Sequence, residues 1–177
     1  MRSHSIFIFL SLAFLLTQCY AQNSPNNLPQ VQNEAFNQEL KRLLSFSVPL
    51  VGVDELATIQ KKAVLLDARA EEEYQTAHIP GARFVGYEQL QLDEVFKLPK
   101  DTTIVVYCSV GYRSERVAEK LKAAGFQKVY NLYGGIFEWA NKGFPLEDAA
   151  KRPTNQLHTY NKRWSKWVEN PQIKKQW

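Results

Sequence analysis

The sequence predicts an α/β fold in which a central, mostly parallel sheet is flanked by helices. Short apolar, β-branched runs alternate with stretches of helical periodicity, as in parallel sheets, where helices connect the strands. The clearest strand candidates, 63–66 and 104–107, are almost wholly apolar, which is typical of strands buried on both faces. A mature length of about 155 residues suits one domain, and 45% of the chain is hydrophobic.

Helices are expected on both sides of the first strand. One short helix is predicted over 53–60, before this strand, and another over 71–77, after it. The three leading glutamates of the helix over 71–77 suit the positive end of a helix dipole. The segment 78–82 contains Pro and Gly and predicts a turn with a short strand. The first helix is predicted from four apolar residues at helical spacing: Phe36, Leu40, Leu43 and Leu44.

The second half continues the alternation. We expect Ser114 to cap a helix that Gly125 ends. A strand over 129–132 follows. Gly134 and Gly135 then turn the chain into a last helix, which stops before 143–145.

Cys108 stands where a reactive thiol is expected. It follows the strand over 104–107 and opens a short loop that leads into the next helix. Ligands of parallel sheets bind beyond the carboxyl ends of the strands, and loop amides with a helix N-terminus favour an anion there. We therefore expect the pKa of the Cys108 thiol to fall and its nucleophilicity to rise. A buried structural cysteine is the alternative.

Residues 1–21 have the pattern of a secretory signal peptide. Arg2 precedes an apolar run over 6–16, which is too short to span a bilayer. Cleavage after Ala21 is expected, and a lipoprotein anchor at Cys19 or an uncleaved anchor are the alternatives. We expect a periplasmic or secreted protein. Cleavage after Ala21 would leave Cys108 without a partner, although exported proteins normally pair their cysteines.

Motifs over 45–148 resemble the rhodanese (sulfurtransferase) family. The resemblance implies a rhodanese-like domain there, with a leader and N-terminal helix over 22–44 and a tail over 149–177 outside it. In chain order, the matching segments are 65–69, 73–74, 78–82, 105–108, 113–114, 124–126, 130–135 and 139–145.

The resemblance implies a persulfide mechanism. The Cys108 thiolate would attack the sulfane sulfur of a donor such as thiosulfate, and sulfite would leave. A thiol or cyanide, or a protein acceptor, would then take the sulfur. No cofactor is implied, no metal-ligand cluster is visible in the sequence, and nucleic acid is not expected as a partner of an exported protein.

The loop supplies candidate substrate contacts. Arg113 would bind an anionic donor or pair with a surface carboxylate. Arg69 would help to hold the donor or pair with Glu73. Tyr112 would contact the donor or cover the site, and Gly111 is expected to give the tight loop a positive φ. Further candidate contacts are Ser109, Val110 and Ser114, and Asp67 is expected to brace the loop.

Two other cysteine chemistries fit less well. A Cys-His hydrolase would need His78 or His158 beside Cys108, and His78 lies in a Pro-Gly turn that indicates a structural role. Related phosphatase and arsenate-reductase loops are one residue longer and carry an arginine where this chain has Ser114. The loop over 108–113 has six residues, which suits a compact sulfur centre.

The tail is basic and aromatic. It carries seven Lys or Arg and one acid, Glu169, whereas the body is mildly acidic. We expect a helix that packs its aromatic side on the protein's own domain, away from the Cys108 loop, because indoles have a large surface to bury. A protein partner or an anionic membrane surface are the alternatives. The residues at helical spacing are Tyr160, Trp164, Trp167 and Val168.

Two classes of function follow. The intact loop favours an enzyme, a single-domain sulfurtransferase of the thiosulfate type. The long tail keeps a second class open, a persulfide carrier or redox-sensing module that acts with a protein partner and turns over little.

Overall fold

Five parallel strands form the central sheet of the computed structural model, which describes residues 28–177. Their order is β1-β5-β4-β2-β3, so the predicted α/β sheet is confirmed. The expected signal peptide or lipid anchor over 1–21, and the first part of the leader, lie outside the described residues. The strands are β1 (Leu50–Val51), β2 (Val64–Asp67), β3 (Arg83–Phe84), β4 (Thr103–Tyr107) and β5 (Lys128–Leu132).

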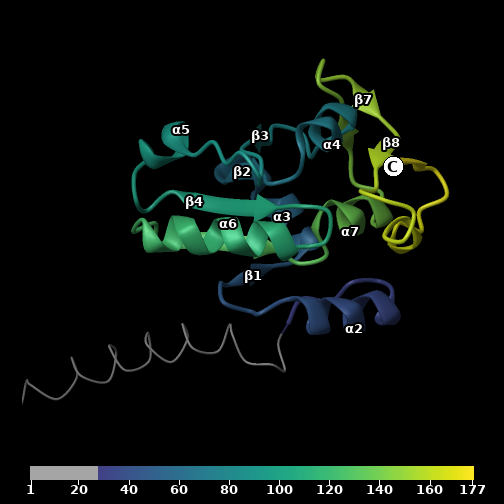
Figure 1. Cartoon of the computed structure of the whole chain (residues 1–177), viewed down its shortest axis with the longest axis horizontal. Helices are drawn as coiled ribbons and strands as arrows, with labels where there is room; N and C mark the ends of the chain where they lie inside the picture. The colour runs from purple at the N-terminus through teal and green to yellow at the C-terminus, as the bar shows by residue number, and fades with distance from the viewer. Residues whose placement is uncertain (1–27) are drawn as a thin grey trace, which may run out of the picture.

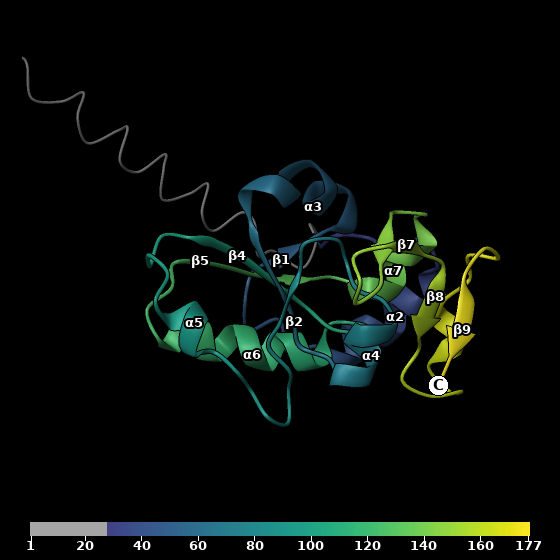
Figure 2. The same ribbon diagram turned by 90° about the horizontal axis from the view of Figure 1, so that it is seen from above.

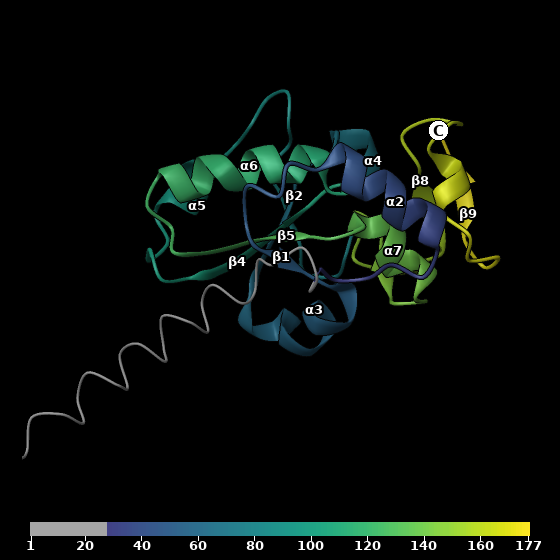
Figure 3. The same ribbon diagram turned by 90° about the horizontal axis from the view of Figure 1, so that it is seen from below.

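The helices cover both faces of the sheet. Figures 2 and 3 show α5 and α6 on one face and α3 on the other. No helix in the described part of the chain is long and apolar enough to cross a membrane. The helices are α2 (Glu34–Leu43), α3 (Val53–Ile59) with the 3-10 turn η2 (Gln60–Lys62), α4 (Glu71–Thr76), α5 (Asp93–Phe96), α6 (Tyr112–Ala123) and α7 (Gly135–Asn141).

The start of α6 differs from the prediction. The helix begins at Tyr112, and Gly111 rather than Ser114 occupies its N-cap position. The Ser114 hydroxyl donates to the Gly111 carbonyl oxygen at 3.1 Å. Ser114 therefore lies inside the first turn of the helix and supports the loop from there.

The alternation of side chains along β4 divides the core into two clusters. Val105 and Tyr107 face the cluster that also contains residues of α2, α3 and α7. Ile104 and Val106 face the cluster beneath α5 and α6. Because successive side chains of a strand point to opposite faces, one apolar run supplies both clusters.

The N-terminal helix belongs to the same core as the sheet. Phe36 and Leu40 of α2 are fully buried and join the cluster that contains Tyr107. Figure 1 shows α2, α7 and the tail gathered near the ends toward which the strands run. The helix α2, which was expected outside the rhodanese-like domain, thus contributes to the hydrophobic core of that domain.

The tail docks on the domain as predicted, but it is not a helix. It consists of short strands, β7 (Pro153–Thr154), β8 (Gln156–His158) and β9 (Lys174–Gln176), with one 3-10 turn, η3 (Ser165–Trp167). β7 pairs with β6 (Leu146–Glu147) and β8 with β9. Tyr160 has φ +65°, and a left-handed residue interrupts a right-handed helix.

The aromatic residues of the tail reach the core through this irregular path. Val168 is fully buried, and the Trp167 ring stacks on Phe36 with a centroid separation of 5.2 Å. Asn141 of α7 donates to the Trp167 carbonyl oxygen at 2.8 Å. These contacts stabilise the tail against α2 and α7. Trp164 packs against the same core, so three of the four residues expected on the docking face serve it.

Candidate active site

The Cys108 loop lies directly beyond the carboxyl end of β4. The Gly111 N–H donates to the Cys108 sulfur at an N···S distance of 3.2 Å. Gly111 has φ +121°, which confirms the expected positive value and aims its amide at the sulfur. A thiolate or persulfide anion at this position is stabilised by that amide dipole.

The N-terminus of α7 holds the other side of the loop. The Ile136 N–H donates to the Cys108 carbonyl oxygen at 2.9 Å, and the Phe137 N–H donates to that of Ser109 at 3.2 Å. Gly135 permits this approach, because a Cβ on it would clash with the Cys108 carbonyl oxygen and lie 2.6 Å from that of Ser109. The Gly-Gly pair in the sequence was the signal for this contact, which sequence reasoning treated only as a turn.

A buried amide fixes the Gly111 end of the loop. Asn131 of β5 donates to the Gly111 carbonyl oxygen at 3.0 Å and accepts from the Ser114 hydroxyl at 2.7 Å. Ser114 is fully buried and lies behind the loop. Ser114 does not line the cavity in front of Cys108, and its hydroxyl is engaged by Gly111 and Asn131, which places it behind the loop and away from the predicted substrate contact.

Arg113 closes the loop on a buried carboxylate. Its two terminal nitrogens donate to the two Glu73 oxygens at 2.7 and 2.9 Å. The Ser109 hydroxyl also donates to Glu73, at 2.9 Å. Glu73 is 1% exposed, so the pairing foreseen as an alternative for Arg113 is present and is buried rather than superficial.

The charges of this pair support each other. Burial alone would raise the pKa of Glu73, but the hydrogen bonds and positive charge of Arg113 outweigh burial and lower it below its ordinary 4.5. Burial alone would lower the pKa of Arg113, but Glu73 and the nearby Cys108 sulfur raise it. Both groups are therefore ionised at neutral pH, and the Arg113 charge is already compensated.

Arg69 is held away from the sulfur site by Asp67. It is fully buried, and its guanidinium donates to both Asp67 oxygens and, at 2.6 Å, to the Ala77 carbonyl oxygen. Arg69 pairs with Asp67 in place of the predicted partner Glu73, and it does not line the cavity in front of Cys108. Asp67 braces Arg69 rather than the loop, because its carboxylate bonds to Arg69 and to no loop residue.

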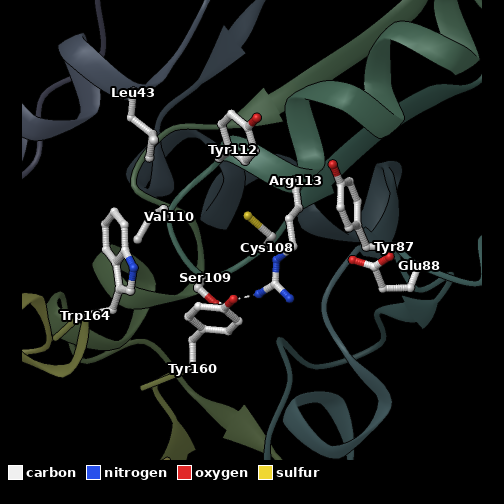
Figure 4. Close-up of a pocket in the computed structure, with 10 residues that line it drawn as sticks. All are labelled: Leu43, Tyr87, Glu88, Cys108, Ser109, Val110, Tyr112, Arg113, Tyr160 and Trp164. Atoms are coloured by element: carbon white, nitrogen blue, oxygen red, sulfur yellow. Dashed lines mark hydrogen bonds between the residues drawn. The ribbon is translucent and has the colours of Figure 1, made fainter. Parts of the chain in front are cut away.

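A cavity of about 260 Å³ opens in front of Cys108. Figure 4 shows the sulfur in the middle of a ring of side chains drawn from four segments of the chain. The predicted Ser109, Val110, Tyr112 and Arg113 line it, whereas Leu43, Tyr87, Glu88, Tyr160 and Trp164 were not predicted as site residues. Tyr160 and Trp164 correct the expectation that the tail packs away from this loop.

The two histidines considered as a possible base for Cys108, His78 and His158, do not line the cavity. His78 stacks on Tyr74 at 3.9 Å between ring centroids and lies 3.3 Å from a Glu147 oxygen. His158 accepts from the Tyr160 N–H through its ring Nδ1. Within residues 28–177, the lining of the cavity includes neither imidazole, so this part of the chain does not place beside Cys108 the base that a Cys-His hydrolase needs.

Comparison with known proteins identifies this arrangement. Residues 53–142 match the family of the rhodanese-like domain. The chain belongs to this family. A rhodanese-fold crystal structure, that of the thiosulfate sulfurtransferase from Pseudomonas aeruginosa, superposes with a TM-score of 0.54 and 29% identity over 67% of this chain and 23% of that one.

Three relatives of this rhodanese-like chain show the range of the family. MoeZ of Mycobacterium tuberculosis, named as an adenylyltransferase/sulfurtransferase, is 37% identical over 48% of this chain and 22% of its own length. The thiosulfate sulfurtransferase GlpE of Coxiella burnetii is 34% identical over 52% of this chain and 84% of its own length. YrkF of Bacillus subtilis, named as a sulfur carrier, is 30% identical over 70% of this chain and 57% of its own length. The match to MoeZ thus spans less than a quarter of that protein.

Proposed function

We propose that this chain is a sulfurtransferase of the thiosulfate type, which carries a sulfane sulfur as a persulfide on Cys108. The observation that carries the proposal is the Gly111 N–H at 3.2 Å from the Cys108 sulfur, within a six-residue loop at the mouth of a cavity. One amide aimed at the sulfur favours an anion there without a histidine base.

The transfer has two balanced steps. The Cys108 thiolate attacks the outer sulfur of thiosulfate, the S–S bond of the donor breaks, and sulfite leaves with the electron pair. An acceptor such as cyanide or a thiolate then attacks the outer sulfur of the Cys108 persulfide, and the electron pair returns to Cys108. The name of the Coxiella relative supports thiosulfate as donor.

Steady-state turnover with thiosulfate and cyanide tests this function. We expect thiocyanate to form with the purified protein and not with Cys108→Ser, since a hydroxyl at this position is not a nucleophile at neutral pH. The fold of that variant should persist, because Glu73 holds the loop through Ser109 and Arg113 and not through the sulfur. An absence of turnover by the wild-type protein would overturn the proposal.

A second candidate is a persulfide carrier or redox-sensing module that turns over little and passes sulfur to a protein partner. The name of the Bacillus relative favours it. Stoichiometric loading of Cys108 with sulfur, without catalytic release to cyanide or to small thiols, would support this candidate against the enzyme.

We also propose that the protein is exported with its signal peptide cleaved after Ala21. The support is the charged start followed by the apolar run over 6–16. Intact mass of the protein recovered from the secretory fraction tests this: a mass that begins at Gln22 supports cleavage. A lipid-modified Cys19 would indicate the anchored alternative, and retention of 1–21 in the cytosol would contradict export.

A further inference from the structure

Part of the wall around Cys108 comes from outside the rhodanese-like domain. Leu43 of α2 and Tyr160 and Trp164 of the tail line the cavity, and all three lie beyond the matched segment 53–142. Figure 4 shows Trp164 and Leu43 beside Val110, with Tyr160 near Arg113. Two segments that this chain adds to the domain therefore meet at its reactive sulfur.

Tyr160 is held in place at an energetic cost. Its φ of +65° is uncommon for a residue with a bulky side chain. Its ring lies 5.3 Å from the Arg113 guanidinium carbon, in a cation–π contact. The contact covers one face of Arg113, whose nitrogens are already bonded to Glu73.

The cavity is largely apolar, and its described lining residues present no uncompensated positive charge to a ligand. Arg113 and Glu88 are its two charged lining residues, and the charge of Arg113 is already paired with that of Glu73. Most of the other lining side chains are aliphatic or aromatic, contributed by Leu43, Tyr87, Val110, Tyr112, Tyr160 and Trp164. An apolar group of a few carbon atoms loses its contact with water against such walls, which favours its binding.

We propose that the sulfur-exchanging partner of Cys108 is a small organic thiol, or its persulfide, that carries an apolar or aromatic group. The proposal rests on the persulfide function and names its substrate class. A cavity of about 260 Å³ has room for one small ligand rather than for a protein segment. The apolar group would lie against Trp164, Leu43 and Val110, with its sulfur toward Cys108.

The exchange itself needs no further reactant. The thiolate RS⁻ attacks the outer sulfur of the Cys108 persulfide. The S–S bond of the product R–S–SH forms as the S–S bond of the Cys108 persulfide breaks. The proton stays on the transferred sulfur, and the electron pair returns to Cys108 as a thiolate beside the Gly111 amide. The reverse reaction loads Cys108 from an organic persulfide.

Two thiols of similar acidity test the proposal: benzyl mercaptan, which carries an aromatic ring, and 2-mercaptoethanol, which carries a polar hydroxyl group. With thiosulfate as donor, we expect kcat/KM for benzyl mercaptan to exceed that for 2-mercaptoethanol by on the order of tenfold or more, because burial of a few carbon atoms contributes such a factor. In Trp164→Ala the ratio should fall to about one. Because the readout is a ratio within one variant, a partial loss of folded protein cancels.

Two further variants complete the test. Tyr160 is largely exposed, so Tyr160→Ala should fold and should also lower the ratio. Trp177 is 59% exposed and does not line the cavity, so Trp177→Ala should leave the ratio unchanged. Wild-type turnover of cyanide with a thiol ratio near one would overturn this inference alone, whereas a lack of turnover with every acceptor would overturn the proposed function.

Discussion

Arg113 and Glu73 form a buried, two-pronged ion pair that joins the Cys108 loop to α4. The residues are 40 positions apart in sequence, and the side chain of Glu73 is 1% exposed while that of Arg113 is 16% exposed. Glu73 also accepts the Ala70 N–H and the Ser109 hydroxyl. The carboxylate thus has four donors around it, and removal of either charge leaves the other one buried and uncompensated.

Arg113→Ala should therefore unfold the protein more easily as well as impair sulfur transfer. Breaking a buried ion pair by removing one partner costs roughly 3–5 kcal/mol. Denaturant unfolding at neutral pH measures this loss. Arg152→Ala is the control, since the side chain of Arg152 is 75% exposed and pairs with Asp148 at the surface. Equal effects of the two substitutions would show that burial of the Arg113 pair contributes nothing.

Glu73→Gln should change how stability depends on pH. The pKa of Glu73 in the folded protein lies below its ordinary 4.5, so the unfolded chain binds the proton at a higher pH than the folded protein does. Its contribution is fully present above about pH 4.5 and is lost as the pH falls through the lower, folded-state pKa. The difference in unfolding free energy between wild type and Glu73→Gln should shrink over that acidic range. A difference that stays constant from pH 7 down to pH 3 would contradict the argument.

Gly135→Ala should displace the Cys108 loop. The added Cβ would meet the backbone oxygens of Cys108 and Ser109, neither of which can move without breaking the hydrogen bonds to α7. Gly81→Ala is the control, because Gly81 also has a positive φ, +78°, but open space around it. We expect sulfur transfer to fall steeply in the first variant and to persist in the second. Comparable activity in both would show that the close approach is unimportant.

Trp167→Ala should destabilise the protein strongly although it lies outside the matched domain. Loss of the stack on Phe36 leaves a cavity between tail and α2, and large-to-alanine substitutions of buried aromatic residues cost about 3–5 kcal/mol. Partial exposure of Trp167 places the expected loss at the lower end of this range. The melting temperature from thermal unfolding measures this loss. Trp177→Ala is the control, because the side chain of Trp177 is exposed. An unchanged melting temperature for Trp167→Ala would mean that the tail does not stabilise the domain.

The sheet and the loop were predictable from sequence because their signals are local. A β-branched run predicted β4, and Cys108, Gly111 and Arg113 follow it at fixed spacing. Arg69 was placed near the right strand end but with the wrong partner. A carboxylate two positions away on the strand is closer than Glu73 on the next helix, and periodicity does not rank such competing partners.

The tail was harder to predict because helical spacing alone does not establish a helix. Tyr160, Trp164, Trp167 and Val168 have that spacing, yet only 165–167 adopt one turn of 3-10 helix. Asn161 bonds the Trp164 N–H through its side chain, and asparagine favours such local turns over helix. The meeting of Tyr160 and Trp164 with Cys108 depends on long-range packing that no sequence motif encodes.

The mass of the Cys108 peptide after brief reaction with thiosulfate tests the central claim most directly. The account predicts that the wild-type peptide gains one sulfur atom, that cyanide removes it with formation of thiocyanate, and that the Cys108→Ser protein gains none. Formation of thiocyanate by Cys108→Ser, or turnover by wild-type protein whose Cys108 never carries sulfur, would contradict it.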